Sequence, residues 1–87
     1  LAALQPGNPE PVYRLGSIAF RLKDYPGAIT QFEQCTRLQP GNPFYWHDLG
    51  IAYYYAGRRV EAQAAMRQAL MLDPNHAAAR QALLMMK

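Results

Sequence analysis

The stretch Leu4-Gln5-Pro6-Gly7-Asn8-Pro9 returns letter for letter as Leu38-Gln39-Pro40-Gly41-Asn42-Pro43. A third and looser copy begins at Leu72-Asp73-Pro74, and the spacing between successive copies is the same. A fixed period of about 20 to 50 residues is typical of repeat proteins, in which each unit packs on its neighbours. The chain is therefore predicted to be an array of similar units.

The segments between these copies share a second pattern. One reads Trp46-x-x-Leu49-Gly50-x-x-Tyr53, then Ala62-x-x-x-Met66 and Pro74; the other reads Val12-x-x-Leu15-Gly16-x-x-Ala19, then Ala28-x-x-x-Phe32 and Pro40. This pattern resembles the tetratricopeptide repeat, a helix–turn–helix unit of about 34 residues with the motif Trp-x₂-Leu-Gly-x₂-Tyr…Ala-x₃-Phe…Pro. The chain departs from the motif at Met66, Val12 and Ala19. The resemblance covers nearly the whole chain and implies an all-α solenoid of paired helices.

The register divides the chain into parts of one domain, residues 1–87. We expect two full repeats and a C-terminal helix that caps the stack or begins a third repeat. The expected parts are the end of a preceding helix with its turn at 1–8, repeat one at 9–42, repeat two at 43–76, and the capping or next-repeat helix at 77–87. Because the chain starts late in one unit and stops one helix into another, we expect it to be a segment of a longer protein.

Turn and capping residues predict where the helices begin. Asn8, Asp24 and Asn42 precede apolar periodic segments, and a short polar side chain at that place can accept a free backbone N–H. Lys23 stands where the second unit has Gly57, so it must adopt the backbone conformation that glycine would take. The predicted helices cover residues 9–22, 25–38, 43–56, 59–72 and from 75 or 76 to the end.

The helical periodicity also predicts which residues are buried. The spacing i, i+3, i+4, i+7 describes one face of a helix. We expect Trp46 to be largely buried, and Cys35 to be a packed thiol at a place that this repeat fills with a small apolar residue. The other expected core positions are 12, 15, 16, 19 and 22 in the first helix, Ala28 and Phe32 in the second, and Ala62, Ala65, Met66 and Ala69 in the fourth.

Composition argues against several classes of partner. The net charge is +3, and the nine Lys and Arg residues are spread along the chain, whereas a nucleic-acid binder more often gathers them on one face. No apolar run approaches the roughly 18 residues that span a bilayer. The single cysteine allows no internal disulfide. We therefore expect neither a nucleic-acid partner nor a membrane span in this segment.

The residues that could carry catalysis or bind a metal are few and separated. His47 and His76 belong to different predicted helices, and neither has a second ligand at metal-binding spacing. Asp48 is adjacent to His47, and neighbours on a helix point about 100° apart, so no Asp–His relay is expected. No phosphate-binding glycine loop is present. We expect no enzyme activity, no metal site and no cofactor.

The resemblance implies that the first helix of each repeat lines a concave groove. Two stripes support this surface independently, because residues 13, 17, 20 and residues 47, 51, 54 follow a helical spacing offset from the core spacing. The resulting prediction is a protein–protein interaction scaffold that holds a peptide segment of a partner in an aromatic and apolar groove. The candidate groove residues are Tyr13, Ser17, Phe20, Arg21, Phe44, His47, Ile51, Tyr54, Tyr55 and Gln81, with Glu10, Ala78 and Met85 beside them.

Other interpretations of the same surface stay open. The aromatic side chains could simply complete packing between helices. The segment could also serve assembly or self-association, since the C-terminal helix carries Leu83, Leu84, Met85 and Met86 in succession. It could regulate or target a larger enzyme, or form a nucleic-acid-binding array. In one subset of the family that the chain resembles, Lys and Asn side chains bind the terminal carboxylate of a partner. The predicted stripes contain no such Lys or Asn.

Overall fold

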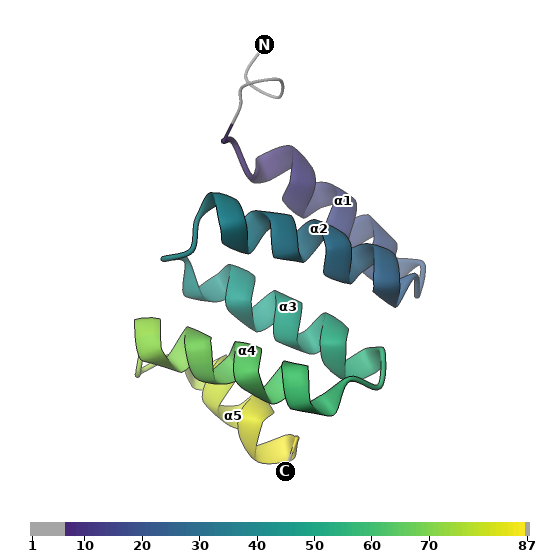
Figure 1. Cartoon of the computed structure of the whole chain (residues 1–87). Helices are drawn as coiled ribbons and strands as arrows, with labels where there is room; N and C mark the ends of the chain where they lie inside the picture. The colour runs from purple at the N-terminus through teal and green to yellow at the C-terminus, as the bar shows by residue number, and fades with distance from the viewer. Residues whose placement is uncertain (1–6, 87) are drawn as a thin grey trace.

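The structure, a computed structural model, describes residues 7–86 as five α-helices without a strand. Each helix packs on the next one in the chain, and α3 also contacts α5. Figure 1 shows α1 to α5 following one another down the molecule in chain order. The predicted all-α repeat fold is confirmed, while the expected tail of a preceding helix at 1–6 lies outside the described residues. The helices are α1 Glu10–Arg21, α2 Tyr25–Leu38, α3 Pro43–Tyr55, α4 Arg59–Leu72 and α5 Ala77–Met85.

The helices begin at polar side chains because the first backbone N–H groups of a helix have no partner within it. The Asp24 carboxylate accepts the Gly27 N–H at 3.1 Å, and the Asn42 amide oxygen accepts the Phe44 N–H at 3.0 Å. The predicted caps of α2 and α3 are thus confirmed. The predicted cap of α1 is wrong, because the N-cap residue is Pro9, which makes no side-chain capping hydrogen bond. Asn8, one residue before Pro9, accepts the Glu10 N–H at 3.1 Å.

The turn inside each repeat requires a left-handed backbone conformation. Gly57 has φ 82° in the second repeat, and Lys23 has φ 63° at the equivalent place in the first. The predicted glycine-like conformation of Lys23 is confirmed. A side chain in this region clashes with its own backbone, so Lys23 is strained where Gly57 is not.

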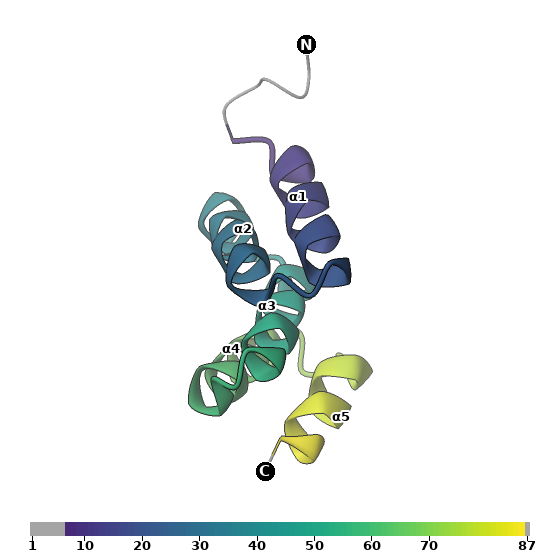
Figure 2. The ribbon, with the colours of Figure 1, turned by 90° about the vertical axis from the view of Figure 1, so that its right-hand side faces the viewer.

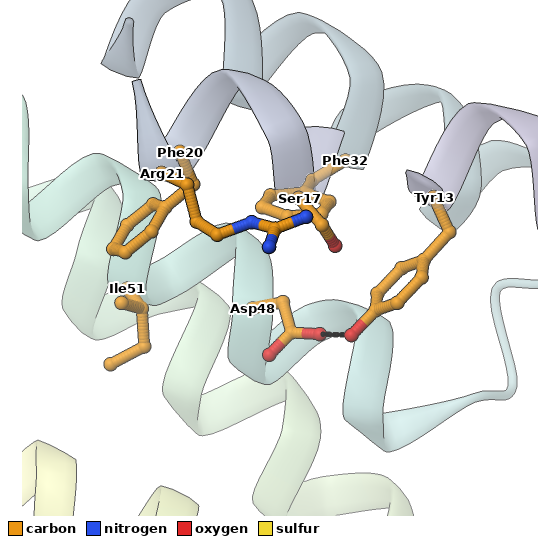
Figure 3. A pocket seen from close by; sticks show the side chains of 7 residues that line it. All are labelled: Tyr13, Ser17, Phe20, Arg21, Phe32, Asp48 and Ile51. Carbon is orange, nitrogen blue, oxygen red and sulfur yellow. Dashed lines mark hydrogen bonds between the residues drawn. The ribbon is translucent and has the colours of Figure 1, made fainter. Parts of the chain in front are cut away.

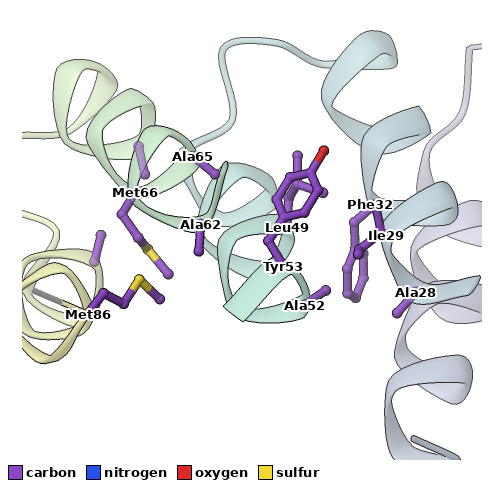
Figure 4. Close-up of a cluster of buried hydrophobic side chains, with 12 residues drawn as sticks. Ala28, Ile29, Phe32, Leu49, Ala52, Tyr53, Ala62, Ala65, Met66 and Met86 are labelled. Atoms are coloured by element: carbon purple, nitrogen blue, oxygen red, sulfur yellow. The ribbon is translucent and has the colours of Figure 1, made fainter. Parts of the chain in front are cut away.

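The core runs through the stack between neighbouring helices (Figure 4). Two glycines let the paired helices approach closely: a methyl group on Gly16 would lie 2.7 Å from the Phe32 ring, and one on Gly50 would lie 2.9 Å from Met66 Cε. Both Phe32 and Met66 are buried as predicted. The close contact between the paired helices therefore explains why α1 and α3 contain a glycine.

Cys35 is confirmed as a packed thiol. It is fully buried, and its Sγ lies 3.9 Å from the Pro9 carbonyl oxygen. Burial raises the pKa of the thiol to about 11. Because the thiolate is the reactive form, this environment keeps Cys35 unreactive near neutral pH.

The predicted core stripe of α1 is wrong at two positions. Leu15 and Leu22 are exposed, and the exposed fraction of Leu22 reaches 75%. The equivalent Leu49 of α3 is buried because α3 lies between α2 and α4, whereas within residues 7–86 α1 packs mainly on α2. The stripe is apolar in both repeats, but only in the second is it covered by described residues.

The prediction for Trp46 also needs correction, because this side chain is only partly buried. Its indole N–H donates to the Pro40 carbonyl at 2.8 Å. The side chain packs against the core and also borders a hollow of about 480 Å³, which Leu49 and Tyr53 line as well. This hollow keeps Trp46 in contact with solvent.

Candidate functional site

The first helices of the repeats, α1 and α3, lie with α5 along one side of the molecule. In the turned view of Figure 2, α1 and α5 project to the right of α2 and α4, with α3 between them. Two hollows open between these three helices, and together we call them the groove. Since Ile51 of α3 lines both, the hollows adjoin.

The first hollow measures about 260 Å³ and lies between α1 and α3. Its apolar walls are Phe20, Phe32 and Ile51, and its remaining lining is polar (Figure 3). The second hollow measures about 110 Å³ and lies between α3 and α5. The polar lining of the first hollow is Tyr13, Ser17, Arg21 and Asp48; the second hollow is lined by Ile51, Tyr54, Tyr55, Ala82, Met85 and Met86.

A hydrogen bond ties α1 to α3 at the first hollow. The Tyr13 hydroxyl donates to Asp48 Oδ2 at 2.8 Å, as Figure 3 shows. Burial, with this hydrogen bond as the second cause, raises the pKa of Tyr13 to about 12. Tyr13 therefore stays a neutral donor throughout the physiological range.

Asp48 also lies against His47, its neighbour on α3. His47 Nδ1 lies 3.2 Å from Asp48 Oδ1. Both Asp48 oxygens thus have partners inside the protein, His47 and Tyr13. Neither partner is the nucleophile that a hydrolytic relay requires.

Four aromatic rings, Phe20, Tyr25, Tyr54 and Tyr55, form a connected cluster that we call the aromatic quartet. Phe20 meets Tyr25 and Tyr55 edge to face, with ring centroids 5.4 Å apart in each pair. Tyr25 and Tyr55 stack at 5.5 Å, and Tyr54 meets Tyr55 edge to face at 5.8 Å. Because Phe20 lines the first hollow and the last two tyrosines line the second, the quartet joins the two hollows.

His76 fixes the start of α5 against α3. It is buried, its Nδ1 accepts the Ala79 N–H at 3.2 Å, and its ring packs on Phe44 and His47 with centroids 5.0 and 5.3 Å away. Its Nε2 is buried without a hydrogen-bond partner among the described residues. His76 thereby holds the helix that closes one end of the groove.

The structure brings most of the predicted groove residues together and separates some of them. Tyr13, Ser17, Phe20 and Arg21 meet Ile51 at the first hollow, and Ile51 meets Tyr54, Tyr55 and Met85 at the second. Phe44 and His47 lie beside the groove, against His76. Like Phe44 and His47, three other predicted residues line neither hollow: Glu10, which pairs with Arg14, and the exposed Gln81 and Ala78 of α5.

Three residues of this site escaped the sequence reasoning. The sequence predicts Phe32 only as a core residue, yet its ring also forms a wall of the first hollow. The sequence presents Asp48 only as a neighbour of His47. Tyr25 starts α2 and so falls outside the stripes of the first helices, although it stacks on Tyr55. The signal that could have found Tyr25 is its place directly after the turn that follows Phe20.

Comparison with known proteins now gives the family. The model of the tetratricopeptide repeat matches residues 9–42 and 43–76. The chain belongs to the tetratricopeptide repeat family. Repeats of this family are non-catalytic and mediate protein–protein interaction.

Three curated relatives carry similar repeats. The chain is 30% identical to the TPR repeat-containing thioredoxin TTL4 of Arabidopsis thaliana over 94% of its own length, and 36% identical to Superkiller protein 3 of Schizosaccharomyces pombe over 70%. It is 40% identical to the chloroplastic tetratricopeptide repeat domain-containing protein PYG7 of Arabidopsis thaliana over 60%. The matches span only 12%, 4% and 17% of these three relatives, respectively.

Residues 7–86 contain neither a membrane-spanning helix nor a cluster of metal ligands. None of the five helices combines the length and the apolar character that crossing a membrane requires. Within the same residues, no three His, Cys, Asp or Glu side chains lie close enough together to hold a metal ion.

Proposed function

We propose that this tetratricopeptide array is a non-catalytic scaffold that binds a peptide segment of a partner protein in the groove. The observation that supports this most directly is the pair of adjoining hollows, which share Ile51 and are bordered by incompletely buried aromatic rings. The exposed fractions of Tyr54 and Tyr55 are 39% and 56%. Contiguous apolar surface of this kind is typical of interaction sites.

The lining favours a peptide over a small polar ligand. The walls are mainly aromatic and aliphatic, and the hydroxyl groups of tyrosine add polar contacts at the rim. Tyrosine is enriched among the residues that dominate binding energies at protein interfaces. Because the two hollows lie side by side, a segment with two apolar side chains could occupy both.

A selection from a random dodecapeptide library displayed on phage tests this proposal. The enriched peptides are synthesised with a fluorescein label, and their affinity is measured by fluorescence anisotropy. Tyr54→Ala and Tyr55→Ala should each weaken binding about tenfold or more, as expected for interface hot spots. Both side chains are exposed, so the melting temperatures should change little.

Val60→Ala is the matched control, because Val60 is 78% exposed on α4 and lines neither hollow. It should leave the affinity unchanged. Equal losses in Val60→Ala and Tyr54→Ala would contradict groove binding. If either Tyr54→Ala or Tyr55→Ala unfolds the domain, that residue belongs to the core and not to the binding surface.

Salt dependence separates this proposal from the nucleic-acid alternative. Binding to a phosphate backbone weakens steeply as salt rises, because neutralised phosphates release counterions. Burial of apolar side chains carries no such dependence. The affinity for a selected peptide should therefore stay within about twofold between 50 and 300 mM salt, and a steep fall would favour a charged ligand.

Self-association is a second candidate, and α5 provides the observation that favours it. The exposed fractions of Leu84 and Met85 are 58% and 72%, although a terminal helix of a repeat array usually has a polar outer face. Sedimentation over a concentration series should reveal a reversible dimer that persists at high salt. Leu84→Glu should remain monomeric, while Val60→Glu should dimerise like the wild type. A wild type that stays monomeric at high concentration would contradict self-association.

A regulatory role beside a catalytic domain is a further alternative, since one relative is named as a thioredoxin that contains these repeats. The amino-acid sequence of the full-length protein tests this alternative directly.

A further inference from the structure

The tyrosine hydroxyl groups of the aromatic quartet differ from the polar groups of the first hollow in their hydrogen bonding. Tyr13 and Asp48 satisfy each other across the first hollow. By contrast, within residues 7–86 the hydroxyl groups of Tyr25, Tyr54 and Tyr55 have no hydrogen-bond partner. The three tyrosines therefore present free O–H groups on a surface made of rings.

Arg21 adds further unused donors at the same surface. Its guanidinium reaches over the first hollow in Figure 3 and makes no hydrogen bond or ion pair with any described residue. Arg14, on the same helix, is instead paired with Glu10 at 3.1 Å. The groove and the quartet beside it thus offer unused donors, in the three tyrosine O–H groups and the Arg21 guanidinium.

We infer that the groove binds a proline-rich segment in the extended polyproline II conformation. This inference rests on the proposed function and narrows it to one class of peptide. Proline has no backbone N–H, and a polyproline II helix makes no internal hydrogen bonds, so its carbonyl groups are acceptors without partners. The free tyrosine hydroxyls and the Arg21 guanidinium are suited to donate to those carbonyls.

Ring geometry supports the same class of ligand. Proline-rich segments bind to aromatic-lined grooves in which pyrrolidine rings pack on aromatic rings. The quartet provides such a surface between the two hollows, with successive ring centroids 5.4 to 5.8 Å apart. A segment already extended in solution also loses little conformational entropy on binding.

Charge argues against a basic peptide as the alternative occupant. The chain carries a net charge of +3. Among the described residues that line the two hollows, Arg21 is the charged group without a partner. Asp48, the acidic group there, already accepts from Tyr13 and lies against His47. A neutral, acceptor-rich segment meets these conditions without burying a second positive charge.

The test uses fluorescein-labelled decaproline with an amidated C-terminus and measures fluorescence anisotropy. The matched probe has the same length, with alternate prolines replaced by alanine, which restores N–H groups and relaxes the backbone. Decaproline should bind at least fivefold more tightly than the alanine-containing probe. An acidic peptide with a single phenylalanine serves as the third probe and should bind more weakly than decaproline.

Removal of single hydroxyl groups gives the sharper readout. Tyr54→Phe and Tyr55→Phe keep the rings and their packing, and each should weaken decaproline binding about fivefold, as loss of one neutral hydrogen bond implies. Tyr45→Phe is the control, because Tyr45 packs on Tyr13 and lines neither hollow. Arg21→Gln should weaken binding more than Arg14→Gln, which removes the same charge from the same helix.

The outcomes separate this inference from the proposed function. If library-selected peptides bind in a Tyr54-dependent manner but lack proline and are not displaced by decaproline, groove binding stands and the polyproline inference is overturned. Equal affinity for decaproline and the alanine-containing probe would also overturn it. If no selected peptide depends on Tyr54 or Tyr55, the groove proposal itself fails.

Discussion

Replacement of Gly16 by alanine tests the packing on which the repeat is built. A methyl group at this position would lie 2.7 and 2.8 Å from two ring carbons of Phe32 and 3.2 Å from Gln31 Cβ. Favourable carbon–carbon contacts begin at about 3.5 Å, so the buried ring would have to retreat by roughly 0.8 Å or α1 would have to move away from α2.

Two opposing terms set the magnitude. Alanine gains about 1 kcal/mol over glycine in a helix interior, whereas overpacking a closed core costs about 1–3 kcal/mol. Because Phe32 is a rigid ring with 4% of its surface exposed, we expect the upper part of that cost. Gly16→Ala should therefore be destabilised by about 1–2 kcal/mol, which lowers the melting temperature of a domain of this size by roughly 5–10 °C.

Thermal melts followed by circular dichroism measure this difference. Gly41→Ala is the matched control, since no atom lies within 4 Å of its would-be methyl group, and it should be neutral or slightly stabilised. In a double-mutant cycle, Phe32→Leu should recover about 0.5 kcal/mol or more of the loss in Gly16→Ala, because the two residues are in contact. A Gly16→Ala protein that melts above the wild type would refute the close approach of α1 and α2.

Three further changes probe the turn, the core and the ionisable groups. Lys23→Gly should raise the free energy of unfolding by about 0.5 kcal/mol, because it relieves the left-handed strain at φ 63°; a melt below the wild type would show that Lys23 is not strained. Trp46→Ala should cost about 2 kcal/mol rather than the roughly 3–5 kcal/mol typical of a buried tryptophan, since the ring is partly exposed, and a larger loss in urea unfolding would show that the ring is buried. Burial and the hydrogen bond to Glu33 raise the pKa of Tyr53 from 10.0 to about 12, so its contribution to stability is complete below pH 10 and is lost as pH rises toward 12. Alkaline unfolding over this window should be less steep in Tyr53→Phe, and identical pH profiles would contradict this account.

The repeat register predicted most of the fold because it fixes both the helix bounds and the turn chemistry. The identity of the two hexapeptides already placed the turns that precede α1 and α3, and the observed bounds of α2 and α4 agree with the prediction to the residue. The conformation of Lys23 followed from Gly57 at the same place in the next unit. These features depend on local sequence, which a single chain displays directly.

Burial was harder to predict because it depends on which neighbour covers a helix. Leu15 and Leu49 occupy the same place in the repeat motif, yet only Leu49 lies between two described helices. Periodicity marks the apolar face of a helix and does not show whether another element covers it. Trp46 is partly exposed for a different reason, because it borders a hollow between α2, α3 and α4.

The groove was predicted helix by helix, and contacts between helices were therefore missed. The spacing of residues 13, 17 and 20 identified one wall, but Tyr25 joins the aromatic quartet from the start of α2. Asp48 lines the first hollow, where Tyr13, far earlier in the chain, donates to it. Such pairings depend on how the helices cross, which residue spacing within one helix does not specify.

Methyl-resolved NMR of the wild-type protein, titrated with a peptide selected from the dodecapeptide library, tests groove binding most directly. The account predicts shift changes at the Ile51 and Met85 methyl groups, which line the hollows, and none at Val60 and Met71, which are exposed on α4. Saturating shifts at Val60 and Met71, with Ile51 and Met85 unchanged, would place the binding surface on the opposite side of the array and contradict the proposed function.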